Sequence, residues 1–221
     1  MFSSEKGRIR IDYNTGRNSG GRSRGPGGGG GFDYSDPLRS FLRTLPRVLF
    51  SPRAYFGDIS TRRGFANPLI FAAVCILIGA VLGGVFGVLT RGVPGMQFLA
   101  TQTGVLPTVI SAFASGMIGL AIITGVYHLL VMLLAGTNNA GLEGTFRVVS
   151  YAYASVQVLA WVPLLNILVG LYGLYLCAFG FQGVHSTTYQ RAAAIAALPI
   201  LLVILAMPLL AIIVPLLLAA R

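Results

Sequence analysis

The chain has 221 residues, of which 55% are hydrophobic and only 10% are charged, and its formal net charge at pH 7 is +10. Soluble domains carry about 25% charged residues, so this composition excludes both an ordinary soluble globular protein and a disordered chain. It predicts an all-α fold: a polytopic bundle of transmembrane helices with a basic N-terminal region.

The charges are concentrated at the start of the chain. Residues 1–67 hold twelve of the 16 basic residues and five of the six acidic residues. The rest of the chain is therefore an almost uncharged body that follows a basic, polar region. Two cysteines, Cys75 and Cys177, lie in apolar runs, where neither a disulfide nor a cysteine metal site is expected.

Residues 1–34 are predicted to be a disordered Gly/Arg-rich cytoplasmic tail. Glycines 27–31 follow a stretch of Gly, Ser, Asn and Arg that has too few apolar side chains to form a core. A solvated linker is the simplest interpretation of this composition. Binding to RNA or to anionic lipid is the alternative, because arginine attracts phosphate.

Residues 35–63 are predicted to form an amphipathic helical region at the membrane interface. Leucines and Phe41 recur at helical spacing, Asp36-Pro37 is a suitable helix start, and Pro46 should bend or end the helix. A basic amphipathic segment before a span typically lies on the cytoplasmic leaflet, although packing on a neighbouring protein domain is the alternative. The residues predicted to bind lipid or a partner are Arg39, Arg43, Arg47, Arg53, Arg62 and Arg63.

Residues 64–221 are predicted to be a five-span transmembrane domain. About 20 apolar residues cross a bilayer, and four long segments after residue 63 (64–90, 92–142, 148–190 and 192–220) have no charge at all. Pro163 and Asn166 should divide the third of them into two spans, and Pro199, Pro208 and Pro215 should kink the last span. The first span is expected to remain in the protein as a signal anchor. The spans are predicted at about 67–90, 105–135, 144–162, 165–183 and 192–219.

Basic residues are expected to accumulate on the cytoplasmic side of a membrane protein. A cytoplasmic N-terminus places the basic tail, Arg147 and Arg191 inside, and Arg91 and Arg221 outside. Five spans then place the C-terminus outside.

Small residues at intervals of three or four predict close helix contacts within the bundle. Glycine lets helix backbones approach each other in lipid, and contacts within one chain are favoured here over dimer formation. The predicted packing positions are Gly79, Gly83, Gly87, Gly116, Gly170 and Gly173.

The predicted membrane interior offers little chemistry. Its notable polar residues are His128, Tyr151 and Asn166, and no carboxylate lies inside a predicted span. His128 could relay protons, but hydrogen bonding to a neighbouring helix is the more common role of such a group. Protease, nucleotide-binding and metal motifs are absent, so we expect no enzyme activity, no catalytic or metal-binding residue and no cofactor.

The order of several short motifs resembles the Yip family, the Ypt/Rab-interacting-protein domain, in its bacterial branch. The resemblance covers about residues 45–218 and implies a five-span bundle with a cytoplasmic N-terminus. It is carried by Ser51-Pro52, Tyr55-Phe56, Phe65, Pro68-Leu69, residues 151–154, residues 161–163, residues 170–172, Val184-His185 and Arg191-Ala192. In this pattern, Val184, His185 and Arg191 are expected to be structural or interfacial.

Eukaryotic relatives bind small GTPases in vesicle traffic and carry an Asp-Leu-Tyr-Gly-Pro motif in the tail. This chain has Ser35-Asp36-Pro37-Leu38 instead, so GTPase binding is not carried over.

The leading hypothesis is a non-enzymatic membrane adaptor, assembly factor or membrane organiser. Its partners would be membrane lipids with anionic headgroups and, through its small-residue faces, a homo- or hetero-oligomer with other membrane proteins. Nucleic acid is not an expected partner.

The alternative is a transporter or permease subunit for an uncharged or lipidic solute, with Tyr127, His128, Tyr151 and Asn166 around a polar cavity. A third hypothesis, an intramembrane hydrolase, needs a serine beside His128. The expected location is a bacterial plasma membrane.

Overall fold

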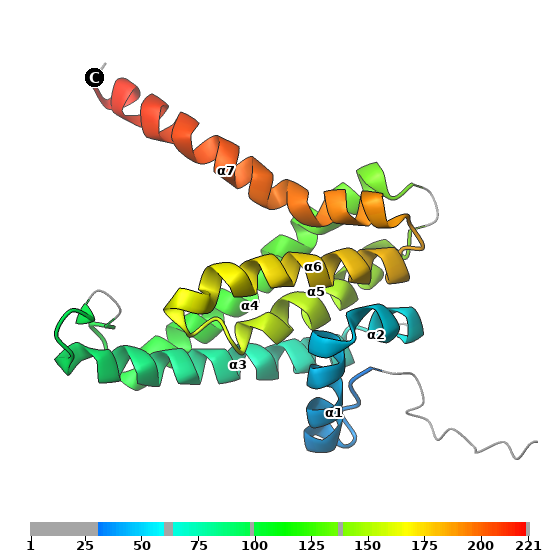
Figure 1. The fold of residues 1–221 in the computed structure, drawn as a ribbon, viewed down its shortest axis with the longest axis horizontal. Coiled ribbons are helices and arrows are strands. Elements are labelled where there is room, and N and C mark those ends of the chain that lie inside the picture. Colours follow the sequence, from blue (N-terminus) through cyan, green and yellow to red (C-terminus); the bar gives the residue numbers. More distant parts are fainter. Residues whose placement is uncertain (1–30, 60–63, 98–99, 137–138, 220–221) are drawn as a thin grey trace, which may run out of the picture.

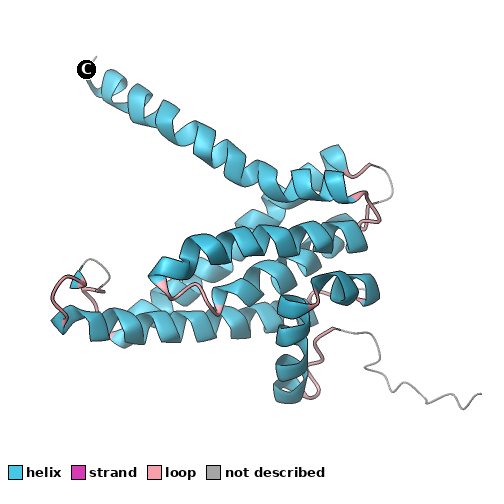
Figure 2. Cartoon of the chain, in the orientation of Figure 1, coloured by secondary structure: helices cyan, strands magenta, loops and turns pink. Residues whose placement is uncertain are grey.

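The computed structural model describes residues 31–59, 64–97, 100–136 and 139–219. These ranges are helical and contain no strand (Figure 1, Figure 2). The predicted disorder of residues 1–30 lies outside the described residues, as do Arg62 and Arg63. The elements are α1 (Pro37–Phe50), α2 (Pro52–Asp58), α3 (Ala66–Leu89), η1 (Thr90–Gly92), α4 (Val105–Leu134), α5 (Gly141–Gln157), η3 (Pro163–Leu165), α6 (Asn166–Val184) and α7 (Tyr189–Ala219).

Four of these helices are long and apolar enough to cross a membrane: α3, α4, α6 and α7. The helix α5 has 17 residues, which rise about 25 Å and so fall short of a hydrocarbon core of about 30 Å. It begins three residues before the predicted start at residue 144 and ends five residues before the predicted end at residue 162. Residues 158–162 turn before η3 because Pro163 cannot donate the backbone hydrogen bond that a continuing helix needs.

The helix α5 lies in the middle of the bundle, against α3, α4 and α6 (Figure 1). Most of its residues are buried, including the small residues Gly144, Ala152 and Ala154. Glycines on the neighbours allow this close approach. A Cβ on Gly173 of α6 would stand 3.2 Å from a methyl group of Val156, and one on Gly79 of α3 would collide with the backbone oxygen of Gln157.

Five of the six glycines predicted at packing positions lie against a neighbour. In addition to Gly79 and Gly173, Gly116 of α4 faces Ile76, and Gly83 and Gly87 face Trp161 and Thr101.

The sixth glycine, Gly170 of α6, has no atom within 4 Å of the place where its Cβ would stand. None of the described residues therefore packs at this position, where Gly170 is exposed, and its packing role stays a prediction.

The helix α7 runs without interruption from Tyr189 to Ala219, through the three prolines expected to kink it. Its first turns pack on α6 and α4, where Ala192, Ile195 and Ala196 are fully buried. Its second half leaves the bundle and extends away from α6 (Figure 1).

The helices α1 and α2 lie near the start of α3, and α1 runs crosswise to the bundle (Figure 1). Val48 of α1 and Tyr55 and Phe56 of α2 are almost fully buried. The helix α1 continues through Pro46 to Phe50, so this proline does not end it. Pro46 is exposed, so water can bind the carbonyl group that loses its partner.

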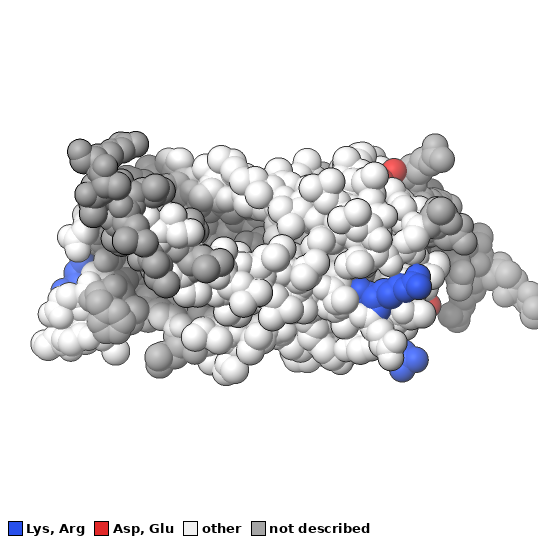
Figure 3. Space-filling model, turned by 90° about the horizontal axis from the view of Figure 1, so that it is seen from above, with Lys and Arg blue, Asp and Glu red and all other residues white. Residues whose placement is uncertain are grey.

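The charged side chains lie toward the two ends of the long axis. Seen from above, the described Lys and Arg side chains are near the ends and the middle of the visible face carries none (Figure 3). An uncharged middle zone between charged ends matches the profile of a bilayer, because a charge in hydrocarbon is costly.

Candidate functional site

The helix α1 presents three different strips around its circumference. Successive residues are about 100° apart, so residues three or four apart share a side. One strip is buried against the bundle and the first exposed strip beside it is apolar, with Leu38 72% and Leu42 64% exposed. Next to these leucines lies the basic strip of Arg39, Arg43 and Arg47.

The arginines of the predicted binding surface differ in their surroundings. Arg39 and Arg43 are exposed on α1, and Arg53 is exposed on α2. Arg47 lies 3.9 Å from the Asp58 carboxylate, and its guanidinium carbon is 5.8 Å from the centre of the Tyr55 ring. Arg47 therefore has partners within the protein, whereas Arg39, Arg43 and Arg53 extend toward the surroundings. The binding role of the set stays a prediction.

A buried aromatic cluster attaches this surface to the bundle. The rings of Tyr55 on α2 and Tyr151 on α5 meet edge-on with centroids 5.5 Å apart, and Phe71 of α3 is 4.9 Å from Tyr151. Burial raises the pKa of Tyr55 well above its usual range, so its hydroxyl group stays neutral. Two rings of the transmembrane domain, Tyr151 and Phe71, thereby hold α1 and α2 in position through Tyr55.

The segment just before α1 joins the same cluster. Phe32 is 2% exposed, its backbone N–H donates to the Tyr151 hydroxyl at 3.2 Å, and its ring lies 5.9 Å from that of Phe71. Tyr151, predicted as an interior polar residue, is therefore an anchor for the chain that leads into α1. Sequence reasoning missed Phe32 because the preceding glycines determined the prediction for residues 1–34. The two aromatic residues that follow the glycine run, Phe32 and Tyr34, are a usable signal.

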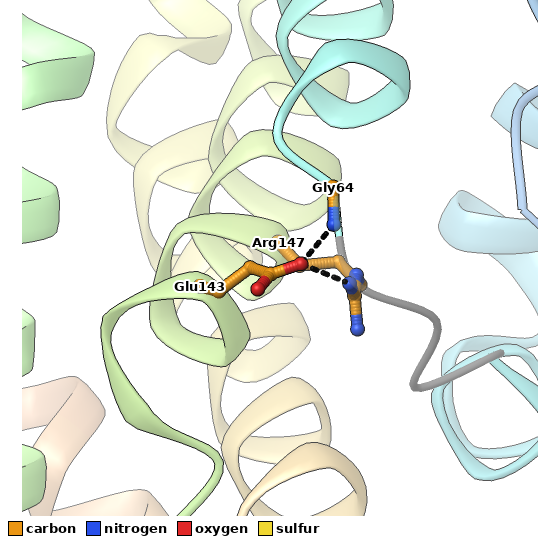
Figure 4. A network of polar contacts seen from close by, with 3 residues as sticks. All are labelled: Gly64, Glu143 and Arg147. Carbon is orange, nitrogen blue, oxygen red and sulfur yellow. Dashed lines mark hydrogen bonds and ion pairs between the residues drawn. The ribbon is translucent and has the colours of Figure 1, made fainter.

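Glu143 and Arg147 form an ion pair at the start of α5 (Figure 4). Their N–O distance is 3.3 Å, and the Arg147 side chain is 7% exposed. Glu143 also accepts the backbone N–H of Gly64, which lies two residues before α3 (Figure 4). A buried guanidinium needs a counter-charge, so this carboxylate stabilises Arg147 in its buried position and joins the starts of α3 and α5. The spacing of four residues could have revealed the pair.

A polar cluster joins α4, α5 and the end of α6 at the same end of the bundle. The Thr145 hydroxyl lies 3.3 Å from Nδ1 of His128 and 3.3 Å from Nε2 of His185. Nδ1 of His185 accepts the backbone N–H of Ala140 at 3.1 Å. His185 is 1% exposed, and burial with a contribution from nearby His128 lowers its pKa from 6.5 to about 4. The cluster connects the three elements through hydrogen bonds.

The residues expected around a transport cavity do not converge. Tyr127 donates to the backbone oxygen of Ala196, His128 faces Thr145, and Tyr151 accepts from Phe32. Asn166 is exposed at the start of α6, the end of that helix opposite His185. In the described ranges these side chains serve separate contacts, which is the pattern of a packed bundle.

The serines required by the hydrolase hypothesis also lack the necessary geometry. Ser111 and Ser115 both donate to backbone oxygens of their own helix, and both are exposed. His128 contacts Thr145 instead.

These features define a class of protein: a multi-pass helical membrane protein in which a basic helix lies across one end of the bundle. The family model described as the Yip1 domain matches residues 47–212. This is most of the chain, so the protein belongs to the Yip1 domain family. The resemblance to the Yip family is confirmed, and its bacterial branch stays a prediction. No curated protein and no solved structure matches the chain. The match begins inside α1, so the residues before it, including Arg39 and Arg43, lie outside the family pattern.

Proposed function

We propose that this protein is a non-enzymatic membrane adaptor, assembly factor or membrane organiser that binds lipid or protein partners through its cytoplasmic basic region. The observation that supports it is the arrangement of α1. Exposed Leu38 and Leu42 border exposed Arg39 and Arg43 on a helix that lies crosswise to the bundle (Figure 1). An interfacial helix needs an apolar strip for acyl chains and adjacent cations for lipid phosphates, and α1 has both.

The proposed topology has five spans, with the N-terminus cytoplasmic and the C-terminus outside a bacterial plasma membrane. The helix α5 would be a span in addition to the four long helices and the third in chain order. It is shorter than the others and is shielded from lipid by α3, α4 and α6. Arg147 and Arg191 lie at the end that also carries α1 and α2, and Arg91 lies at the other end, where it donates to the Thr101 carbonyl. The positive-inside rule favours this orientation, and the bacterial location rests on the family resemblance.

Anionic headgroups are the first ligands that we propose. An arginine near an anionic leaflet contributes about 1 kcal/mol, so Arg39, Arg43 and Arg53 together contribute about 3 kcal/mol. Arg47 contributes less, because its charge already faces Asp58. The two exposed leucines add stabilisation when acyl chains cover them.

A tryptophan placed on the apolar strip tests the lipid contact. The chain has one tryptophan, so Trp161→Phe provides a silent background for Leu42→Trp in the full-length protein. In nanodiscs of phosphatidylglycerol with brominated acyl chains, we expect strong quenching of the new tryptophan. Leu133→Trp, at a 78% exposed position of α4, is the positive control for lipid contact.

Replacing Arg39 and Arg43 together by Gln should reduce the quenching of Leu42→Trp and leave that of Leu133→Trp unchanged. If Leu42→Trp is not quenched while Leu133→Trp is, α1 does not lie in the membrane interface. The proposal would then be wrong for lipid.

Protein partners and homo- or hetero-oligomers are the second part of the proposal. Crosslinking in native membranes with the full-length protein should give partner bands that weaken when Arg39 and Arg43 are both changed to Glu. Equal bands for the variant and the natural sequence would exclude the basic strip of α1 as the contact surface.

A further inference from the structure

An open groove of about 640 Å³ lies between the α1–α2 link and α6. One wall is formed by residues 50–54, and the other by Tyr175 and Phe179 of α6. The helices are held together on both sides of it. The Tyr172 hydroxyl donates to the Leu49 carbonyl, and Gly183 lies so close to Phe56 that a Cβ would stand 2.6 Å from its backbone oxygen.

The α6 wall belongs to a continuous series of aromatic rings that begins at Tyr172 of α6 and ends at Tyr189 of α7. Tyr172 stacks on Tyr175 at 5.7 Å, Tyr175 meets Phe179 edge-on at 4.9 Å, and Phe179 lies 5.4 Å from Tyr189. Tyr175 is 46% exposed, and Phe50 across the groove is 82% exposed. Rings with an apolar body and a polar hydroxyl group are enriched where a membrane protein meets lipid headgroups.

The charge in the groove has one sign. Arg53 is the charged residue of the lining, which includes no carboxylate. Within the described ranges, Arg53 has no hydrogen bond or ion pair, while the nearest acid in sequence, Asp58, faces Arg47. A guanidinium presents a planar fork of donors that matches the oxygens of a phosphate group.

From these contacts we infer that the groove is a binding site for a single anionic phospholipid. Its phosphate binds the Arg53 guanidinium, and the first part of its acyl chains lies along Phe50, Tyr175 and Phe179. The inference rests on the proposed membrane-interface position of α1 and names one site within it. The groove is of a size usual for small-ligand pockets, which is enough for a headgroup and the adjoining chain segment.

A phospholipid fits the groove better than a peptide does. One wall belongs to α6, a candidate membrane span, and α1 and α2 cover only part of that helix, so the opening adjoins the acyl region of the leaflet. The described walls belong to helices, so they offer no strand edge for an extended peptide to join. The single cation suits one phosphate, in contrast to the open row of Arg39 and Arg43 on α1.

Native mass spectrometry of the full-length protein in detergent tests this site, with phosphatidylglycerol and phosphatidylcholine as the two probes. The natural sequence should retain one phosphatidylglycerol at concentrations where it does not retain phosphatidylcholine. Arg53→Gln should weaken that retention by about tenfold, the effect of losing a charge-assisted hydrogen bond. Arg53→Lys, which keeps the charge and loses the fork, should retain more lipid than Arg53→Gln.

Arg191→Gln is the matched control, because it removes one exposed arginine from α7, at the same end of the bundle, and none from the groove. It should leave the single bound lipid in place. Equal losses for the two Gln variants, or no loss for Arg53→Gln, would overturn the groove as a lipid site. A protein dimer without bound lipid that dissociates in Arg53→Gln would also overturn it, in favour of a second copy as the occupant.

The two proposals fail separately in these experiments. Quenching of Leu42→Trp without an effect of Arg53→Gln would leave the interfacial helix intact and remove the groove site. An effect of Arg53→Gln without quenching at Leu42→Trp would keep a lipid in the groove and remove the interfacial position of α1.

Discussion

The Nδ1 atom of His185 accepts the backbone N–H of Ala140 at 3.1 Å, across 45 residues of sequence. Only the neutral imidazole can accept at this nitrogen, because both ring nitrogens of the protonated form are donors. The proton of the neutral ring then lies on Nε2 and faces the Thr145 hydroxyl at 3.3 Å. This contact between the end of α6 and the start of α5 therefore depends on pH.

Acidification should destabilise the protein through His185. Its pKa is lowered from 6.5 to about 4, so between these values an unfolded chain binds a proton that the folded chain does not. Stability should be constant above about pH 6.5 and fall by about 1.4 kcal/mol per pH unit below it, by about 3 kcal/mol in all at pH 4. Thermal unfolding in detergent across this range measures the slope. The slope should become smaller in His185→Gln, and an unchanged slope would assign the acid sensitivity to another group.

Removal of the Glu143 carboxylate should destabilise the bundle. Glu143→Gln takes the counter-charge from Arg147, whose side chain is 7% exposed, and we expect a loss of about 2 kcal/mol. The double variant Glu143→Gln with Arg147→Met removes the buried charge as well and should recover part of that loss. Denaturant titration of the three proteins in mixed micelles checks the order. A double variant less stable than Glu143→Gln would show that Arg147 stabilises the fold mainly through its other contacts.

Two glycines of similar appearance in the sequence should respond oppositely to alanine. A Cβ at Gly79 would collide with the Gln157 backbone oxygen, so Gly79→Ala must separate α3 from the end of α5, at a cost of about 1–3 kcal/mol. A Cβ at Gly170 meets nothing within 4 Å, so Gly170→Ala should be neutral or stabilise α6 by up to about 1 kcal/mol. Unfolding midpoints of the two variants give the comparison, and equal destabilisation would contradict the contacts described for α5.

The hydroxyl group of Tyr151 should hold the chain that leads into α1. Tyr151→Phe leaves the ring cluster and removes the acceptor of the buried Phe32 N–H, which should cost about 1–3 kcal/mol locally. Hydrogen exchange at Phe32 should accelerate, with little change in the middle of α5. Tyr175→Phe, which removes an exposed hydroxyl group from α6, should leave exchange at Phe32 unaffected.

Hydropathy was sufficient to predict the long helices closely. The predicted span 67–90 corresponds to α3 (Ala66–Leu89) and the predicted span 105–135 to α4 (Val105–Leu134), because a bilayer requires an apolar length that composition reveals directly. The end of α5 was predicted five residues too late, because this prediction also relied on apolar composition. Residues 158–162 are almost all apolar, and apolar composition does not distinguish a helix from a turn inside a bundle.

The contacts that hold the candidate site together were less accessible from the sequence. Phe32 and Tyr151 are 119 residues apart, and nothing local to either residue indicates that they touch. The strips of α1 were predicted well because they depend only on helical spacing. Which strip would face the bundle depends on the partners that α3 and α5 offer, so Ser40 and Thr44 are buried while Leu38 and Leu42 are exposed.

The divergence of α7 from the bundle divides this helix into two parts with different sources of stability. Ala192 and Ile195 are held by protein, whereas the residues from Leu201 to Met207 are all exposed. Pro208 also cannot donate a hydrogen bond to the preceding turn. In this part of α7 the side chains pack against lipid and not against protein. Extraction into a poor detergent should therefore unfold the protein from this helix inward.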